Sequence, residues 1–293
     1  MTQYGVDLPL ILGHQFEPIT FTYTERDVCL YALGVGAPAD PLDQRELQFV
    51  YERSGEGFKA LPTYAVIYPS GVIDHLLTGD LPGLRFNPMM LLHGEQFLEI
   101  FQPLPTSGTI TCQPKVSAVY DKGSGALVIT DVPCYDEAGT LVALNQMSMF
   151  IRGIGGFGGE RGPSTGGSEP PAREPDVVIR QQTKPEQALI YRLSGDINPL
   201  HADPMMAAFG SFDRPILHGL CSFGFSARHV LKAFADNDIA RFKRIKARFV
   251  KHVFPGETLI TEMWRESDQR ILFQTRVAER DSVAISSAYV ELR

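Results

Sequence analysis

The chain has 293 residues, 44% hydrophobic and 21% charged, a globular mixture long enough for two modest domains or one large one. The formal net charge of −7 argues against nucleic acid or a membrane surface as a partner. No apolar run approaches the roughly 18 residues that span a bilayer. The first residues, "MTQYGVDLPLILGHQFEP", lack the basic region and cleavage site of a secretory signal. Four scattered cysteines predict buried thiols in a reducing compartment.

The first half begins with a helix-like stretch, "DVCLYALGVGAPADPL", and ends in a long segment of alternating apolar and polar residues, 108–153. The turn sequences "DKGSG" and "DEAG" divide this segment, a pattern typical of antiparallel hairpins. We therefore expect an antiparallel meander at the end of the first half.

Glycine and proline dominate residues 153–175, "GIGGFGGERGPSTGGSEPPAREP". Such a run buries too little apolar surface to offset its ordering entropy, which predicts a flexible linker. The alternative is a glycine-rich phosphate loop, but the Lys and Ser or Thr of a P-loop do not follow. The linker divides the chain into an N-terminal unit, 1–152, and a C-terminal unit, 176–293.

The second half repeats the order of the first. "QALIYRLSGDINPLHADP" parallels the first helix-like stretch, and "GLCSFGFSARHVLKAFADN" has apolar residues at helical spacing. A second alternating segment, "ETLITEMWRESDQRILFQTRVAERDSVAISSAYVEL", closes the chain. Each half thus predicts a loop, a long central helix and an antiparallel meander, an α+β arrangement made twice.

The two early loops align with each other but differ in their polar residues. Matching Tyr31 with Tyr191 pairs three polar positions of the second loop with glycine or proline in the first. The pairs are Gly36 with Asp196, Pro38 with Asn198 and Pro41 with His201. This alignment suggests a duplicated module that has kept its polar group in one copy only.

The polar loop "YRLSGDINPLHADP" can carry acid–base chemistry. Because Pro199 restricts the backbone, Asp196 and His201 are displayed from a shaped turn, not a regular helix. A carboxylate and an imidazole can hold a water, remove a proton from it and return one elsewhere, and the Asn198 amide can orient the same water. The alternative is purely structural, with Asx turns in the loop and Asp203 capping the next helix.

A second polar element, "PILHGL", follows about twenty residues later and places Gly219 where the long apolar helix begins. Free N–H groups at a helix start suit an oxygen that becomes anionic. His218 is either a ligand contact or a structural histidine. Acid, base and oxyanion site together predict an enzyme acting on a carbonyl compound. Asp196, Asn198 and His201 could imitate a ligand set, but we expect no metal.

The loop "YRLSGDINPLHADP" resembles the signature of the (R)-specific 2-enoyl-CoA hydratases, or hydratase 2, of the MaoC-like hot-dog family. "LYALGVGA", "LLHGEQFLEI", "GIGGFGG" and "PILHGLCSFGFSARHVL" are similar to the hydratase domains of peroxisomal type 2 multifunctional enzymes, and to stand-alone plant and protist relatives. The resemblance covers nearly the whole chain.

The resemblance implies a double hot-dog fold, in which two antiparallel sheets each wrap a central helix, and a homodimer. It implies reversible hydration of a trans-2-enoyl-CoA to the (3R)-3-hydroxyacyl-CoA in fatty acid β-oxidation. The second unit would carry catalysis and the degenerate first unit would bind the acyl chain. No cofactor is implied, since CoA is part of the substrate. The family suggests the peroxisome, but the C-terminal "ELR" is not a peroxisomal tripeptide, so the expected location is peroxisomal or cytoplasmic.

The resemblance also implies roles for individual residues. Asp196 and His201 match the catalytic pair, Asn198 its water-orienting partner and Gly219 its oxyanion donor. Four further positions match contacts to the acyl-CoA ligand: His93, Gly94, Lys122 and Phe249. Two alternatives remain, a hot-dog acyl-CoA thioesterase and a non-catalytic acyl-CoA binding protein.

The basic stretch "ARFKRIKARFVKH" carries six Lys or Arg residues between Arg241 and Lys251. At strand period, one face is apolar and the other is cationic. The apolar face holds Ile245, Ala247 and Phe249, and the cationic face holds Arg244, Lys246 and Arg248. The cations either form a solvated face or lie near the CoA phosphates.

Overall fold

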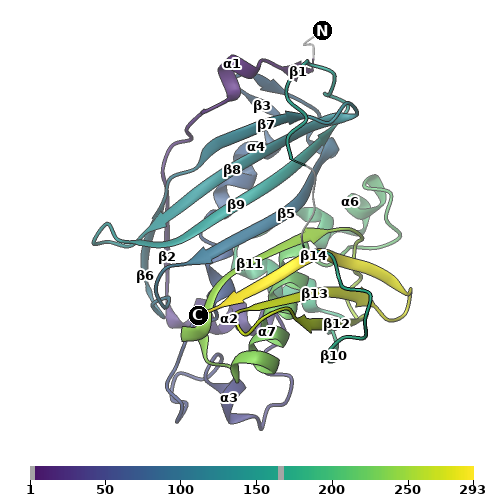
Figure 1. Ribbon diagram of the computed structural model, residues 1–293. Helices are drawn as coiled ribbons and strands as arrows, with labels where there is room; N and C mark the ends of the chain where they lie inside the picture. The colour runs from purple at the N-terminus through teal and green to yellow at the C-terminus, as the bar shows by residue number, and fades with distance from the viewer. Residues whose placement is uncertain (1–3, 164–167) are drawn as a thin grey trace.

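The computed structural model describes residues 4–163 and 168–293, and an antiparallel sheet of eleven strands dominates these residues (Figure 1). The strands of the first half are β2 (Ile19–Tyr23), β5 (Leu91–Ile100), β6 (Gly108–Cys112), β7 (Lys115–Asp121), β8 (Gly125–Tyr135) and β9 (Leu141–Arg152). Those of the second half are β10 (Val177–Gln182), β11 (Phe242–Phe249), β12 (Thr258–Arg265), β13 (Arg270–Val277) and β14 (Ser282–Leu292). A small separate sheet joins β1 (Gly5–Val6), β4 (Leu84–Arg85) and β3 (Asp80–Leu81).

Both halves have the same strand order. The order along the sheet is β10-β12-β13-β14-β11-β5-β9-β8-β6-β2, with β7 paired to β8 beside it. From the outer edge inward, the second half has the order β10-β12-β13-β14-β11 and the first half β2-β6-β8-β9-β5. If the five strands of each half are numbered along the chain, without β7, both orders are 1-3-4-5-2. This shared topology agrees with the duplication inferred from the two early loops.

The two halves are joined edge to edge. β5 pairs with β11 along a continuous register from Arg244 opposite Glu99 to Arg248 opposite Glu95. In Figure 1 the sheet runs without a break from the first-half strands through β5 and β11 to the second-half strands. The two predicted antiparallel meanders are therefore parts of one continuous sheet.

The long helix predicted in the second half is α7 (Gly219–Ala235). Nearly every residue of α7 is buried, and it packs against β11, β12 and β14. It ends at Asp236, which has a left-handed backbone and donates its N–H to the Leu231 carbonyl. This helix is the core of the second half.

The long helix expected in the first half is interrupted. A 3₁₀ turn, η1 (Pro62–Val66), precedes the eight-residue helix α4 (Ser70–Leu77). Pro69 lies immediately before α4 and has no N–H to continue the hydrogen-bond ladder from the preceding turn. The remaining helices and turns are α1 (Leu8–Ile11), α2 (Glu25–Gly34), α3 (Gln44–Leu47), η2 (Pro88–Met90), α5 (Gln187–Tyr191), η3 (Arg192–Ser194), η4 (Pro199–His201), α6 (Pro204–Phe209) and η5 (Ile239–Arg241).

The two aligned early helices, α2 and α5, pack against each other at the centre of the molecule. The fully buried rings of Tyr31 and Tyr191 lie 6.0 Å apart between centroids. A Cβ on Gly34 would stand 3.2 Å from the Cα of Tyr191. The close approach of the two backbones therefore favours glycine at position 34, since a side chain there would push Tyr191 away by a few tenths of an ångström.

The loop after α2 is filled by side chains of α7. Gly36 has a φ of 77°, and a Cβ there would lie 2.3 Å from the Phe225 ring. Behind it, Arg228 Nη2 pairs with Glu46 Oε1 at 3.1 Å, and Arg228 Nη1 donates to the Val35 carbonyl at 2.9 Å. Arg228 is 4% exposed and Glu46 2%. The loop without the polar group therefore forms a buried contact between the halves. We call this contact, made by Gly36, Phe225, Arg228 and Glu46, the joint.

The Gly/Pro-rich segment lies between the strands of the two halves, and its described parts are fastened to the fold. The Asp121 carboxylate accepts from the N–H groups of Gly156 and Gly158, each at 2.9 Å. Trp264 Nε1 donates to the Arg173 carbonyl at 2.9 Å. The middle of the predicted linker, 164–167, lies outside the described residues. Residues 153–163 and 168–175 are therefore anchored at both ends, which differs from a freely flexible linker.

The four cysteines are free thiols. Cys112 and Cys134 face each other across β6 and β8, with their sulfur atoms 3.4 Å apart. Among the helices of the described chain, none combines the length and apolar character needed to cross a membrane.

Candidate active site

The polar loop after α5 is shaped by its own side chains. Asp196 Oδ1 accepts from the Asn198 N–H at 3.2 Å, and Asn198 Oδ1 accepts from the Leu200 N–H at 3.0 Å, which starts η4. Asp203 Oδ1 accepts from the Met205 N–H at 2.8 Å and caps α6. The structural interpretation of this loop, with Asx turns and a helix cap, is therefore confirmed.

The same turns also bring three functional side chains together. One oxygen or nitrogen atom from each of Asp196, His201 and His218 lies within 4.8 Å of the other two. A single water can lie within about 2.8 Å of atoms spaced in this way. The structural interpretation therefore does not exclude the functional one, which stays a prediction.

The tautomer of His201 is fixed by a backbone carbonyl. His201 Nδ1 lies 2.8 Å from the Ile216 carbonyl oxygen, which can only accept, so Nδ1 carries the proton and Nε2 has the free lone pair. Burial lowers the pKa of His201, and the negative charge of Asp196 opposes that shift. The ring is thus a neutral proton acceptor beside a carboxylate.

His218 packs directly behind this pair. It is 1% exposed, and its Nε2 lies 3.1 Å from the Asp196 carbonyl oxygen. Its ring stacks on His201, with centroids 3.7 Å apart and planes 27° apart, and it contacts the Tyr191 ring at 4.8 Å. Sequence reasoning left the role of this histidine open, and only its position beside Gly219 pointed to it.

Gly219 begins α7, as predicted, so its N–H belongs to the first turn, where amide groups have no partner within the helix. Gly219 is exposed, and a Cβ there would lie 3.2 Å from the Phe249 ring. A side chain at this position would therefore press on Phe249 and cover the amide. The glycine leaves the helix start open to a ligand oxygen.

His93 on β5 lies across the β5–β11 seam from Phe249, the residue that a Cβ on Gly219 would meet, and Gly94 follows His93 in the chain. The ring of His93 meets that of Phe249 edge to face, with centroids 5.1 Å apart. Gly94 is the extra residue of a β-bulge, because His93 pairs with Met149 while Glu95 pairs with the next residue, Ser148. Burial lowers the pKa of His93 from 6.5 to about 4. Its buried Nε2 has no hydrogen-bond partner within the described residues.

Lys122 is a predicted site residue that no recorded contact brings to this group within the described residues. It lies in the turn between β7 and β8, where its Nζ donates to the carbonyls of Arg161 and Pro163 in the connecting segment. These two bonds hold that segment in place, and the ammonium group also lies 5.7 Å from the centroid of the Tyr120 ring. Its contact with an acyl-CoA stays a prediction.

The cationic face of β11 is paired with acidic residues of neighbouring strands. Arg244 lies 2.6 Å from Glu291, and Lys246 lies 3.0 Å from Glu95. Ile245 and Ala247 on the opposite face are fully buried, as expected. For Arg244 and Lys246 the pairing favours a structural face over binding of the CoA phosphates.

Asp196, His201 and His218 form the cluster that best resembles a metal-ligand set in the described chain. Ring nitrogen atoms bind a metal in the plane of the ring. Two rings stacked 3.7 Å apart and nearly parallel direct their lone pairs side by side, not toward one point about 2 Å from each. The residues therefore do not fit a shared ion.

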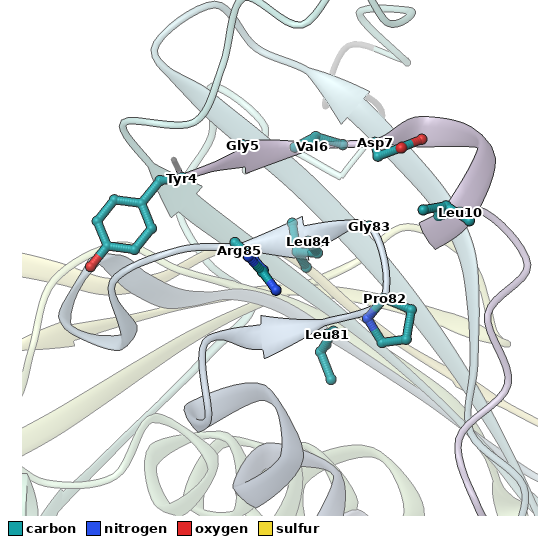
Figure 2. A pocket seen from close by; sticks show the side chains of 10 residues that line it. All are labelled: Tyr4, Gly5, Val6, Asp7, Leu10, Leu81, Pro82, Gly83, Leu84 and Arg85. Carbon is teal, nitrogen blue, oxygen red and sulfur yellow. The ribbon is translucent and has the colours of Figure 1, made fainter. Parts of the chain in front are cut away.

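A separate hollow of about 710 Å³ lies between the N-terminal segment and the β3–β4 hairpin. Figure 2 shows Tyr4, Val6 and Leu10 on one side and Leu81 to Arg85 on the other. None of the predicted site residues lines it. The chemistry-bearing side chains are therefore gathered elsewhere, around the start of α7.

Comparisons with known proteins match both halves. The family model of the MFE-2 hydratase 2 N-terminal domain matches residues 21–153, and that of the MaoC like domain matches residues 167–288. The chain is 46% identical over 285 residues to a probable enoyl-CoA hydratase 2 of Dictyostelium discoideum, covering 96% of this chain and 95% of the relative. It is 49% identical over 283 residues to the peroxisomal multifunctional enzyme type 2 of Mus musculus, where it spans 38% of the longer protein.

Solved structures agree with this family. A MaoC-like dehydratase from Phytophthora capsici has a TM-score of 0.88 and 39% identity, with 98% of each chain covered. A conserved hypothetical protein of Mycobacterium tuberculosis with a double hotdog fold has a TM-score of 0.62 and 12% identity over 97% of this chain, and shows the fold alone. The α+β double hot-dog prediction is thereby confirmed, and the chain belongs to the hydratase 2 family of MaoC-like proteins.

Proposed function

We propose that this protein catalyses the reversible hydration of a trans-2-enoyl-CoA to the (3R)-3-hydroxyacyl-CoA in fatty acid β-oxidation, as a hydro-lyase. The observation that carries the proposal is the convergence of Asp196 and His201 next to the start of α7. The names of the relatives, enoyl-CoA hydratase 2 and peroxisomal multifunctional enzyme type 2, support the same reaction.

In the hydration direction, Asp196 and His201 hold one water over C3 of the enoyl thioester, and Asn198 orients it. The pair removes a proton from the water as its oxygen adds to C3, and delivers a proton to C2 on the same face. The neutral Nε2 of His201 and the Asp196 carboxylate can both accept that proton. The reaction thus consumes one water and leaves the pair in its starting protonation state.

While the new C–O bond forms, negative charge develops on the thioester oxygen. The Gly219 N–H receives this oxygen, because the first turn of a helix offers unpaired amides and a partial positive charge. The distance from this amide to the acid–base pair is set by the His218–Gly219 dipeptide. The chemistry needs no metal or other cofactor, since CoA enters as part of the substrate.

The substrate would lie along the seam between the halves. We assign contacts with the acyl-CoA to His93, Gly94, Lys122 and Phe249. The contacts of Phe249 with His93 and with the position of Gly219 support this for the residues at the seam. The N-terminal unit, 1–152, binds the acyl chain, and the C-terminal unit, 176–293, carries catalysis. The partner of this site is an acyl-CoA, and the working form is a homodimer. The location is the peroxisome, which the name of the relative from Mus musculus supports.

The test is an assay with crotonyl-CoA and with a longer enoyl-CoA. The enoyl-thioester absorbance should fall without release of a free thiol, and chiral analysis should give the (3R) product. Release of CoA would instead indicate a thioesterase. Binding without either change would indicate a non-catalytic acyl-CoA binding protein.

A further inference from the structure

His218 makes two contacts that link the catalytic pair to the start of α7. Its Nε2 meets the main-chain carbonyl of Asp196 at 3.1 Å, and its ring stacks on His201 at 3.7 Å. The next residue in the chain is Gly219. One side chain therefore touches the acid, the base and, through the backbone, the oxyanion donor.

The protonation state of His218 follows from these contacts. A carbonyl oxygen only accepts, so Nε2 carries a proton and donates it to Asp196. Burial lowers the pKa of His218 well below its ordinary value, and a positive charge on the stacked His201 would lower it further. His218 therefore stays neutral while His201 gains and loses a proton.

The second ring nitrogen, Nδ1, is buried and has no hydrogen-bond partner within the described residues. A buried unpaired acceptor costs stability, on the order of 1–3 kcal/mol, so a histidine is an unfavourable choice for packing alone. An apolar aromatic ring would fill the same space without that cost. Such a ring would keep the flat face that stacks on His201, but it would lose the Nε2–H donor.

We propose that His218 is a positioning residue, which fixes the place of the Asp196 and His201 side chains relative to the Gly219 amide. The stack fixes the plane of the His201 ring, whose Nδ1 is already held by the Ile216 carbonyl. The Nε2–H bond fixes the backbone from which the Asp196 carboxylate projects. This inference rests on the proposed hydration for its kinetic test.

Three variants separate the two contacts. His218→Phe keeps a ring for the stack and removes the donor, His218→Gln keeps an N–H donor near the Nε2 position and removes the stack, and His218→Ala removes both. Since a misplacement of 1 Å can cost about 100-fold in rate, we expect kcat to fall about 10- to 100-fold for Phe and Ala. KM should change little. The Gln variant should recover part of the loss.

His229→Gln is the matched control. His229 is on the same helix, is 2% exposed, and bonds Thr261 at 2.8 Å and Gln181 at 2.9 Å, with no recorded contact to Asp196 or His201 among the described residues. Its variant should lower the melting temperature and leave kcat unchanged. If it loses as much kcat as His218→Phe, or if His218→Phe keeps the wild-type kcat, the positioning role is wrong.

A second readout does not depend on activity. The charged or titratable groups facing the stacked pair are Asp196, Arg192 and Tyr191. His218→Ala lets water reach His201 and relieves the burial that lowers its pKa. An NMR titration of His201 should therefore show its pKa rising toward about 6.5, whereas His229→Gln should leave it unchanged.

The two tests fail differently. A wild-type protein that does not hydrate enoyl-CoA overturns the proposed function, while the NMR titration still tests the His218–His201 coupling. An unchanged His201 pKa in a folded His218→Ala protein overturns the positioning role, even if the wild-type protein is an active hydratase.

Discussion

The loops after α2 and α5 occupy equivalent places in two halves of the same topology, yet one is filled and the other is open. At Gly36 the space for a side chain is taken by Phe225, and Arg228 and Glu46 are buried behind it. At Asp196 the carboxylate faces two histidines. A fold that is duplicated can thus use one copy of a loop to hold the halves together and the other to do chemistry.

The largest effect should come from the open loop. Asp196→Ala and His201→Ala remove the acid–base pair, so we expect kcat to fall about 10²- to 10⁴-fold in a protein that still folds and binds ligand. Asp203→Ala is the control from the same loop, because Asp203 only caps α6. It should cost about 1 kcal/mol of stability and leave the rate intact. An active Asp196→Ala enzyme would contradict the assigned site.

The next effect concerns the filled loop. Arg228→Met removes the buried partner of the Glu46 carboxylate and leaves it the partly exposed Lys232, 3.3 Å away. Breaking a buried pair costs about 3–5 kcal/mol, and we expect a loss toward the lower end of that range because Lys232 remains. Urea unfolding measures this loss. The exposed pair Arg173–Asp176 is the comparison, and Arg173→Met should cost much less, because solvent screens an exposed ion pair. Equal losses would show that Arg228 and Glu46 do not hold the halves together.

A third change tests whether the filled loop has room for a side chain at Gly36. Gly36→Ala places a side chain against Phe225 in a left-handed backbone, and should cost more than about 1 kcal/mol. Gly13 has nearly the same φ, 82°, with nothing within 4 Å of an added Cβ. Gly13→Ala therefore measures the backbone strain alone, and a smaller loss there isolates the clash with Phe225. Equal losses would mean that Phe225 can move aside.

The last effect is a pH dependence of stability at His229, which is buried on α7 next to Arg228 of the joint. Burial lowers the pKa of His229 from 6.5 to about 3. At a pH between these two pKa values, the His229 ring is protonated in the unfolded chain and neutral in the folded chain. The free energy of unfolding therefore falls as the pH falls. His229→Gln should reduce this slope by up to about 1.4 kcal/mol per pH unit. Unfolding curves recorded at several pH values test this, and parallel slopes in both proteins would contradict it.

Local sequence predicted the parts of the site that depend on neighbours in the chain. The turn from Asp196 to His201, the cap at Asp203 and the start of α7 at Gly219 each follow from residue types within a few positions. The antiparallel strands followed from alternation and turn residues. The interruption before α4 could also have been read from Pro69.

Contacts between distant segments could not be predicted in this way. The pairing of β5 with β11 depends on a register between strands about 150 residues apart, which alternation within each strand does not encode. The stack of His218 on His201 depends on side-chain rotamers in the packed site. Lys122 carries a charge suited to a phosphate, but its position in the β7–β8 turn directs it to backbone carbonyls of the connecting segment.

The β5–β11 seam has a consequence for how the protein could be cut. Main-chain hydrogen bonds along the seam and the buried Arg228–Glu46 pair hold the halves together independently of the covalent connection. Two separate polypeptides ending and starting within 153–175 would therefore reassemble when co-expressed, whereas either piece alone would lack one side of the contact between His93 and Phe249. The smallest active form is therefore the N-terminal half bound to the C-terminal half, whether or not a peptide bond connects them.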